Sequence, residues 1–66
     1  MKLEVGDKVI VLYSTYLHPN HQQGKVLMVK HIYDIGADLC TTSGRVLYHC
    51  KENFCPYSET LEILFN

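Results

Sequence analysis

Short apolar runs, each bounded by turn-forming residues, recur along this 66-residue chain and limit what it can fold into. The runs are rich in Val, Ile, Leu, Tyr and Thr, and Gly, Asp, Asn or Pro separates them. No stretch keeps a helical apolar period, so the pattern predicts an all-β domain. The expected strands cover 8–13, 24–33, 38–42, 45–50 and 61–65.

Length limits the core. Residues 1–66 make one domain, and a chain this short buries only about 60% of the surface that its unfolded form exposes. We therefore expect a thin core. Its expected members alternate along the runs, and they are Val9, Val11, Val26, Val29, Ile32, Leu39, Val46, Tyr48, Leu61 and Ile63.

Several local patterns predict bends and turns. Val26 and Met28 keep one phase and Val29 breaks it, which indicates a bulge or strong bend near Met28. The segment "TSGR" predicts a tight hairpin, because Gly44 can take a positive φ without steric cost. Pro56 and nearby Ser58 indicate a single 3₁₀ turn before the last run.

The fourth run leaves two options open. Side chains alternate across a strand, so Val46, Tyr48 and Cys50 share one face while Leu47 and His49 share the other. Either face could be the core.

The order of these segments resembles that of small SH3-like barrels of the KOW and Tudor-like kind. The resemblance is carried by "VGDKVIVL", "GKVLMVKHI", "TTSGR" and "YSETLEIL", and it covers nearly the whole chain. It implies a five-stranded SH3-like barrel with a bent second strand, a long first loop and a single 3₁₀ turn before the last strand. The long segment "STYLHPNHQQ" contains no Lys or Arg, which weighs against the RNA binding of true KOW motifs.

Charge and hydropathy limit the partners and the cellular location that we expect. Six Lys and Arg against seven Asp and Glu give a net charge of −1, so no broad basic field is expected. The longest apolar run, "VIVLY", is too short to span a bilayer, and we expect a soluble cytoplasmic protein. Cys40, Cys50 and Cys55 are an odd set that fits reduced thiols better than a disulfide framework.

The histidines and cysteines do not form a strong metal or catalytic motif. His18 and His21 make "HPNH", and Cys50 and Cys55 make "CKENFC", but neither spacing is typical of a zinc site. Loop-tip histidines with reduced cysteines are the favoured interpretation. His49 and Cys50 are neighbours that point to opposite faces of a strand, which disfavours an activated thiolate. We expect no cofactor and no enzymatic activity.

Tyrosines are the strongest candidates for recognition. Tyrosine suits interfaces because it combines a stiff apolar ring with a hydroxyl. An aromatic groove is expected beside the long loop, with partner contacts from Tyr13, Tyr16, His18, His21 and Tyr57. The alternative is that two or three of the tyrosines cap the small core.

Two further binding modes compete with the groove. Lys25, Lys30, Arg45 and Lys51 could meet phosphate while tyrosines stack on bases. An oligomer that sequesters a small ligand is a third option. The apolar final run could also pair with a second copy as an edge strand and make a homo-oligomer.

These observations favour a small non-enzymatic binding module that docks a protein partner, with nucleic-acid or nucleotide binding as the alternative. Small proteins of this style are common among phage and mobile-element proteins that bind and inhibit a host factor.

Overall fold

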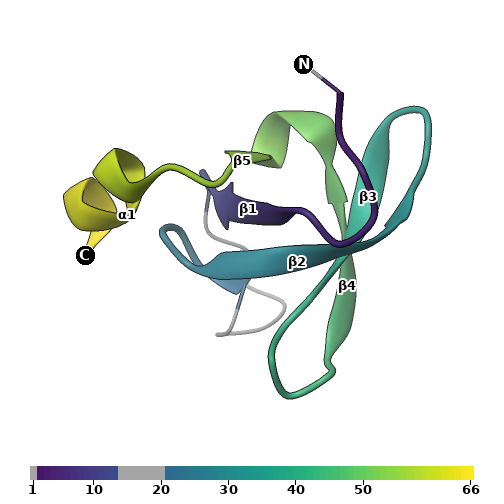
Figure 1. Ribbon diagram of the computed structural model, residues 1–66, viewed down its shortest axis with the longest axis horizontal. Coiled ribbons are helices and arrows are strands. Elements are labelled where there is room, and N and C mark those ends of the chain that lie inside the picture. Colours follow the sequence, from purple (N-terminus) through teal and green to yellow (C-terminus); the bar gives the residue numbers. More distant parts are fainter. Residues whose placement is uncertain (1, 14–20) are drawn as a thin grey trace.

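The computed structural model describes residues 2–13 and 21–66, and these residues form five antiparallel strands with one short helix (Figure 1). The elements in chain order are β1 (Lys8–Val11), β2 (Val26–Ile32), β3 (Gly36–Cys40), β4 (Val46–Cys50), the 3₁₀ turn η2 (Lys51–Asn53), β5 (Phe54–Pro56) and α1 (Glu59–Phe65). The prediction of an all-β domain is confirmed in part, because the domain is mostly sheet but residues 59–65 form a helix.

The strands make one sheet in the order β4-β3-β2-β1-β5. β1 lies between two partners: Ile10 pairs with Val26 of β2 and with Cys55 of β5. In the described part of the chain β4 and β5 do not pair with each other, so the sheet is open between them.

The first four predicted strands are confirmed, and so are the bend and the hairpin. The register of β2 on β3 shifts between Val29 and His31, close to the bulge expected near Met28. In the hairpin Thr41 N–H donates to the Arg45 carbonyl at 2.9 Å, and Gly44 has a φ of +93°. Only a residue without a Cβ adopts that conformation at no cost.

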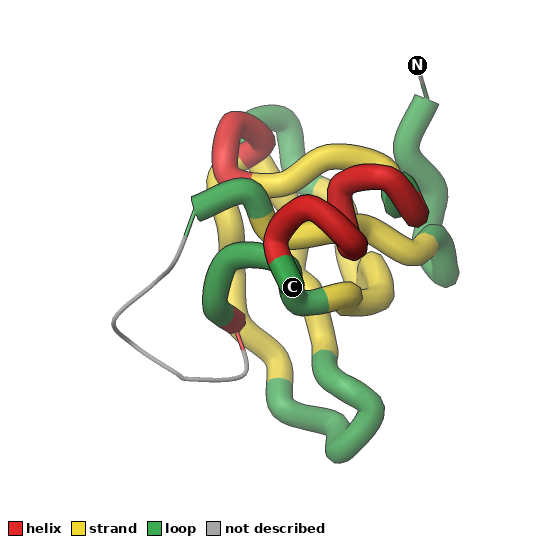
Figure 2. The backbone as a smooth tube through the Cα atoms, turned by 90° about the vertical axis from the view of Figure 1, so that its left-hand side faces the viewer, coloured by secondary structure: helices red, strands yellow, loops and turns green. Residues whose placement is uncertain are grey.

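The predicted strand over 61–65 is wrong, because these residues lie in α1. Ser58 is the N-cap of the helix: its hydroxyl accepts the Leu61 N–H at 3.3 Å. The place beside β1 that a last strand would take belongs to Phe54–Pro56 instead. A 3₁₀ turn does precede the last strand, but it lies at Lys51–Asn53, earlier than Pro56 and Ser58 indicated. In Figure 2 α1 lies in front of the strands.

The core is a cluster of buried apolar side chains from β1, β2, β3 and β5, and Ile10 of β1 is fully buried outside this cluster. Its buried members are Val9, Val11, Leu27, Val29, Ala37, Leu39 and Phe54, with Leu3 packed against them. Of the predicted core, Val9, Val11, Val29 and Leu39 are confirmed, while Val26 and Leu61 are half-buried.

Four of the predicted core residues are wrong: Ile32, Val46, Tyr48 and Ile63 are exposed. Leu47 pairs with Leu39 and His49 with Ala37, and directly opposed residues share a face of the sheet. This pairing turns Leu47 and His49 toward the core and the other side chains of β4 away from it. Ile32 borders a groove at the end of the core, and Ile63 lies on the outer side of α1.

Candidate docking groove and buried histidine pair

A groove of about 620 Å³ runs between the start of β1, the turn after β2 and strand β5. We call it the Tyr57 groove. Its apolar floor includes Leu3, Phe54 and Pro56, and Tyr33 and Tyr57 stand in its walls. The sheet builds the groove, because β5 pairs with β1 and carries Tyr57 to the level of Lys8.

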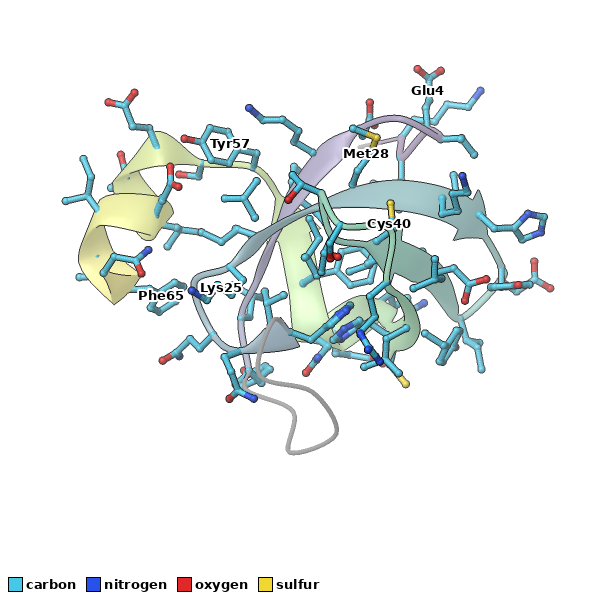
Figure 3. The ribbon with its side chains drawn as sticks, turned by 90° about the horizontal axis from the view of Figure 1, so that it is seen from below. Glu4, Lys25, Met28, Cys40, Tyr57 and Phe65 are labelled. Atoms are coloured by element: carbon cyan, nitrogen blue, oxygen red, sulfur yellow. The ribbon has the colours of Figure 1, made fainter. Side chains whose placement is uncertain are left out.

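Tyr57 is held by neighbours on both sides, and Figure 3 shows it between α1 and the strands. Its backbone N–H donates to the Lys8 carbonyl at 3.0 Å, and the Lys8 ammonium lies 4.9 Å from the centroid of the ring. The phenol donates to Glu62 Oε1 of α1 at 2.5 Å. This hydrogen bond to a carboxylate, and to a smaller extent desolvation, raises the pKa of Tyr57 above 10.0.

Tyr33, which also lines the groove, is fixed in the same way. Its phenol donates to Asp38 Oδ2 of β3 at 2.8 Å, and this bond is the main reason that the pKa of Tyr33 lies above 10.0. The ring centroid lies 4.7 Å from that of His31 and 5.9 Å from that of Tyr48. Both tyrosines of the groove therefore have a restrained ring, yet Tyr33 is 46% and Tyr57 36% exposed.

Charged side chains border the groove unevenly. Lys2, Lys8 and Lys51 line it together with Asp7 and Asp34. Asp7 already accepts the Glu4 N–H at 2.9 Å, so one of the carboxylates is committed to the backbone. Three ammonium groups against two carboxylates leave an excess of one positive charge along the groove, which favours a ligand with negative charge.

The structure does not bring the predicted partner-binding residues together. Tyr57 pairs at the Lys8 end of β1, whereas Tyr13 follows the other end of that strand and is exposed. One groove shared by these two tyrosines is therefore not formed. Tyr16 and His18 lie outside the described residues.

His21 is fully buried, and the expectation of a loop-tip histidine is wrong for it. Its ring stacks on His49 at 5.1 Å between centroids, and Nδ1 of His21 lies 2.9 Å from Nε2 of His49. Asn53 Nδ2 lies 2.7 Å from His49 Nδ1. With the Asn53 amide donating there, His49 carries its proton on Nε2 and donates it to His21. Both rings then bond as neutral imidazoles.

Burial lowers the pKa of His49 below its ordinary 6.5. The charged form would lose solvation, and an added proton on Nδ1 would face the donating amide of Asn53. The pair therefore closes one end of the core as a neutral polar contact. No sequence pattern indicates this contact, because His21 and His49 are 28 residues apart.

The four candidate phosphate-binding residues are exposed but do not make one cluster. Arg45 precedes β4 and Lys51 follows it, so the length of the strand separates them. Lys25 precedes β2 and borders a hollow beside α1, near Phe65 in Figure 3, whereas Lys30 lies at the register shift of β2.

The described residues carry little else that resembles a reactive site. Cys40, Cys50 and Cys55 are free thiols, and burial raises the pKa of Cys55. Within residues 2–13 and 21–66, no three His, Cys, Asp or Glu side chains lie together as metal ligands would. No helix within those residues is long and apolar enough to cross a membrane.

No family model, curated protein or solved structure matches this chain.

Sequence reasoning identified Tyr57 but missed its companions in the groove. Lys8 and Tyr33 line the groove with Tyr57, and Asp38 and Glu62 outside it accept the two phenols. No sequence pattern placed these four residues at the groove. The pairing of β5 with β1 places Lys8 beside Tyr57, and a prediction with 61–65 as the last strand does not contain that pairing.

Proposed function

We propose that this protein is a small non-enzymatic binding module that docks a segment of a protein partner in the Tyr57 groove. The observation that carries the proposal is the pair of exposed tyrosines, Tyr33 and Tyr57, whose phenols are anchored on Asp38 and Glu62. A ring that is already fixed loses little rotamer entropy when a ligand covers it. Aromatic side chains of this kind dominate the energy of many interfaces.

The lining of the groove favours one class of ligand. An apolar side chain fits the floor made by Leu3, Phe54 and Pro56, and a carboxylate fits the border that carries Lys2, Lys8 and Lys51. We therefore propose a peptide segment that places an acidic residue next to an apolar one.

The resemblance to SH3-like barrels belongs to the same proposal. It is supported by the position of β1 between β2 and β5, by the register shift in β2 and by the 3₁₀ turn before β5. The open side between β4 and β5 is the point at which an SH3-like barrel would need closure.

A library of random displayed peptides tests the groove without a known partner. Peptides selected on the wild-type protein should be rich in acidic and apolar residues. Their affinity should fall about tenfold or more for Tyr57→Ala and for Tyr33→Ala, as expected for central aromatic contacts. Tyr13→Ala is the matched control, because Tyr13 is exposed but lies at the other end of β1. Circular dichroism confirms that each variant is folded.

Two results would contradict the groove. Selected peptides that bind Tyr57→Ala and Tyr33→Ala as tightly as the wild type do would place the docking site elsewhere. Tight binding of a single-stranded oligonucleotide that weakens steeply with added salt would instead favour the nucleic-acid alternative, because that dependence reports phosphate contacts.

A further inference from the structure

β4 is an edge strand, and its hydrogen bonds to β3 show which of its residues turn outward. Thr41 N–H donates to the Arg45 carbonyl at 2.9 Å, and Lys51 N–H donates to the Ile35 carbonyl at 3.0 Å. In an antiparallel pair, hydrogen-bonded residues alternate with residues whose backbone groups point away. Leu47 and His49 therefore bond to β3, whereas the N–H and C=O of Val46 and Tyr48 point to the open edge.

The open edge is accessible. No hydrogen bond from another described residue reaches the backbone groups of Val46 or Tyr48. Their side chains are 45% and 41% exposed, and the exposed Cys50 continues the same row. An edge strand with unpaired donors and acceptors is a template for another strand, and proteins usually protect such edges.

Charge selects the kind of strand that fits this edge. Arg45 and Lys51 are exposed residues just beyond the two ends of β4, and both belong to the hydrogen-bonded set. Lys51 and Glu52 both belong to η2, but the Lys51 N–H still continues the hydrogen-bonded row to β3. The edge thus carries an apolar row on one face of β4, and one cation lies just beyond each end of the strand, in phase with Leu47 and His49.

A second copy of this chain that pairs about a two-fold axis at Tyr48 fits the edge poorly. A two-fold axis through Tyr48 would place Val46 opposite Cys50 of the second copy, and Arg45 opposite Lys51. Like charges placed directly opposite each other destabilise a strand pair. A strand with a carboxylate at each end would make two favourable pairs instead.

We propose that the outer edge of β4 takes up an extended segment of another protein as an additional strand of the sheet. The segment has β-branched apolar residues opposite Val46, Tyr48 and Cys50, and carboxylates opposite Arg45 and Lys51. Backbone hydrogen bonds to Val46 and Tyr48 supply much of the affinity, and the two cations select the sequence. This β4 edge is a second docking surface beside the Tyr57 groove, and Lys51 borders both.

A capped synthetic peptide tests this proposal. It carries valine opposite Val46, Tyr48 and Cys50, threonine opposite Leu47 and His49, and aspartate opposite Arg45 and Lys51. Its charge pattern is symmetric, so the test does not depend on strand direction. Titration into the ¹⁵N-labelled protein should shift the amide resonances of Val46 and Tyr48. The peptide should also slow their hydrogen exchange, which is fast in the free protein compared with that of Leu47 and His49.

Variants of β4 distinguish the contribution of its backbone hydrogen bonds to peptide affinity from that of the two cations. Val46→Pro removes one outward N–H without touching the bonds to β3, so affinity should fall about tenfold or more. Val46→Thr keeps the N–H and the β-branched shape, and should bind almost as the wild type does. The double variant Arg45→Glu, Lys51→Glu should lose about fivefold for the aspartate peptide and regain it for the same peptide with lysines in place of the aspartates.

The outcomes that would overturn the proposal are distinct from those for the groove. If the wild type binds the aspartate and lysine peptides with equal affinity, then Arg45 and Lys51 do not select an acidic segment. If the peptide shifts the resonances around Tyr57 and leaves those of Val46 and Tyr48 unchanged, then it does not bind at the β4 edge. If the protein sediments as a dimer and Val46→Pro dissociates it, then a second copy of the chain occupies the β4 edge. Tyr57→Ala should leave the affinity of this peptide unchanged, so either surface can fail alone.

Discussion

β1 and α1 are both apolar segments, yet they differ completely in how they are buried. Val9, Ile10 and Val11 of β1 are fully buried, and β1 has a strand on each side. α1 contains no buried residue, and Ile63 and Leu64 are 70% and 72% exposed. The sheet therefore supplies the stability of the domain, and the helix is attached to its surface.

The contacts that attach α1 are few and mostly polar. Tyr57 donates to Glu62, the Asn66 amide reaches the Gly24 carbonyl at 3.4 Å, and Phe65 lies against Gly24. Such contacts position a helix at little gain in apolar burial. The comparison teaches that an apolar segment gains its structure from the partners that cover it, and that the sequence of the segment alone does not reveal them.

Two isoleucines give the sharpest test of this difference. Ile10 is 0% and Ile63 70% exposed. Ile10→Ala should lower the free energy of unfolding by about 2–5 kcal/mol, because truncation of a fully buried side chain leaves a cavity. Ile63→Ala should change it by less than about 0.5 kcal/mol. Urea denaturation followed by circular dichroism measures both, and similar losses for the two variants would refute the comparison.

Buried His49 of β4 makes a pH-dependent contribution to the free energy of unfolding. Burial holds the pKa of folded His49 below 6.5, so the unfolded chain binds more protons as the pH falls below that value. The stability that neutral His49 provides is complete above pH 6.5 and is lost as the pH falls through the folded pKa. His49→Ala should cost about 1–3 kcal/mol at neutral pH, because it leaves the imidazole of His21 without its ring partner.

The control is His31→Ala, since His31 is an exposed histidine on β2. Urea midpoints measured from pH 7.5 to 5 should fall for the wild type and for this control, and should stay flatter for His49→Ala. Identical pH profiles for all three proteins would show that His49 does not titrate differently on unfolding.

Ser58→Ala tests the start of the helix. The Ser58 hydroxyl accepts the Leu61 N–H, and the loss of an N-cap costs about 1 kcal/mol of helix stability. Because α1 contributes little to the core, we expect the loss to appear as faster hydrogen exchange within α1 while the urea midpoint of the sheet hardly moves. Thr60→Ala is the control, because it changes an exposed residue within the same turn. A shift of the whole unfolding transition would show that helix and sheet unfold together.

The sequence predicted the sheet well because its strands depend on local patterns. Gly44 identified the hairpin, and the broken phase of Val26, Met28 and Val29 identified the bend in β2. Those features involve neighbouring residues, and the structure confirms them.

The predictions that failed concern features that depend on contacts between segments far apart in the sequence. The segment Leu61–Phe65 is as apolar as a strand, but Phe54–Pro56 pairs with β1 and Leu61–Phe65 lies in α1. The inward side of β4 depended on its register with Leu39 and Ala37. The candidate site was found only in part for the same reason: Tyr57 was identified, while Tyr33 and Lys8 reach it through strand pairing.

The smallest expected effect is a change in the titration of Tyr57, and it reports whether α1 stays docked in solution. Glu62 raises the pKa of Tyr57 by accepting its phenolic hydrogen bond. Glu62→Gln removes the carboxylate, so the pKa of Tyr57 should fall toward its ordinary value with almost no change in unfolding free energy. NMR titration of the tyrosine ring resonances measures it, and Tyr33, which bonds to Asp38, is an internal control that should not move. If Tyr57 of the wild type already titrates at its ordinary value, then α1 is not held against β5 in solution. The Tyr57 wall of the groove would then lose the support of Glu62.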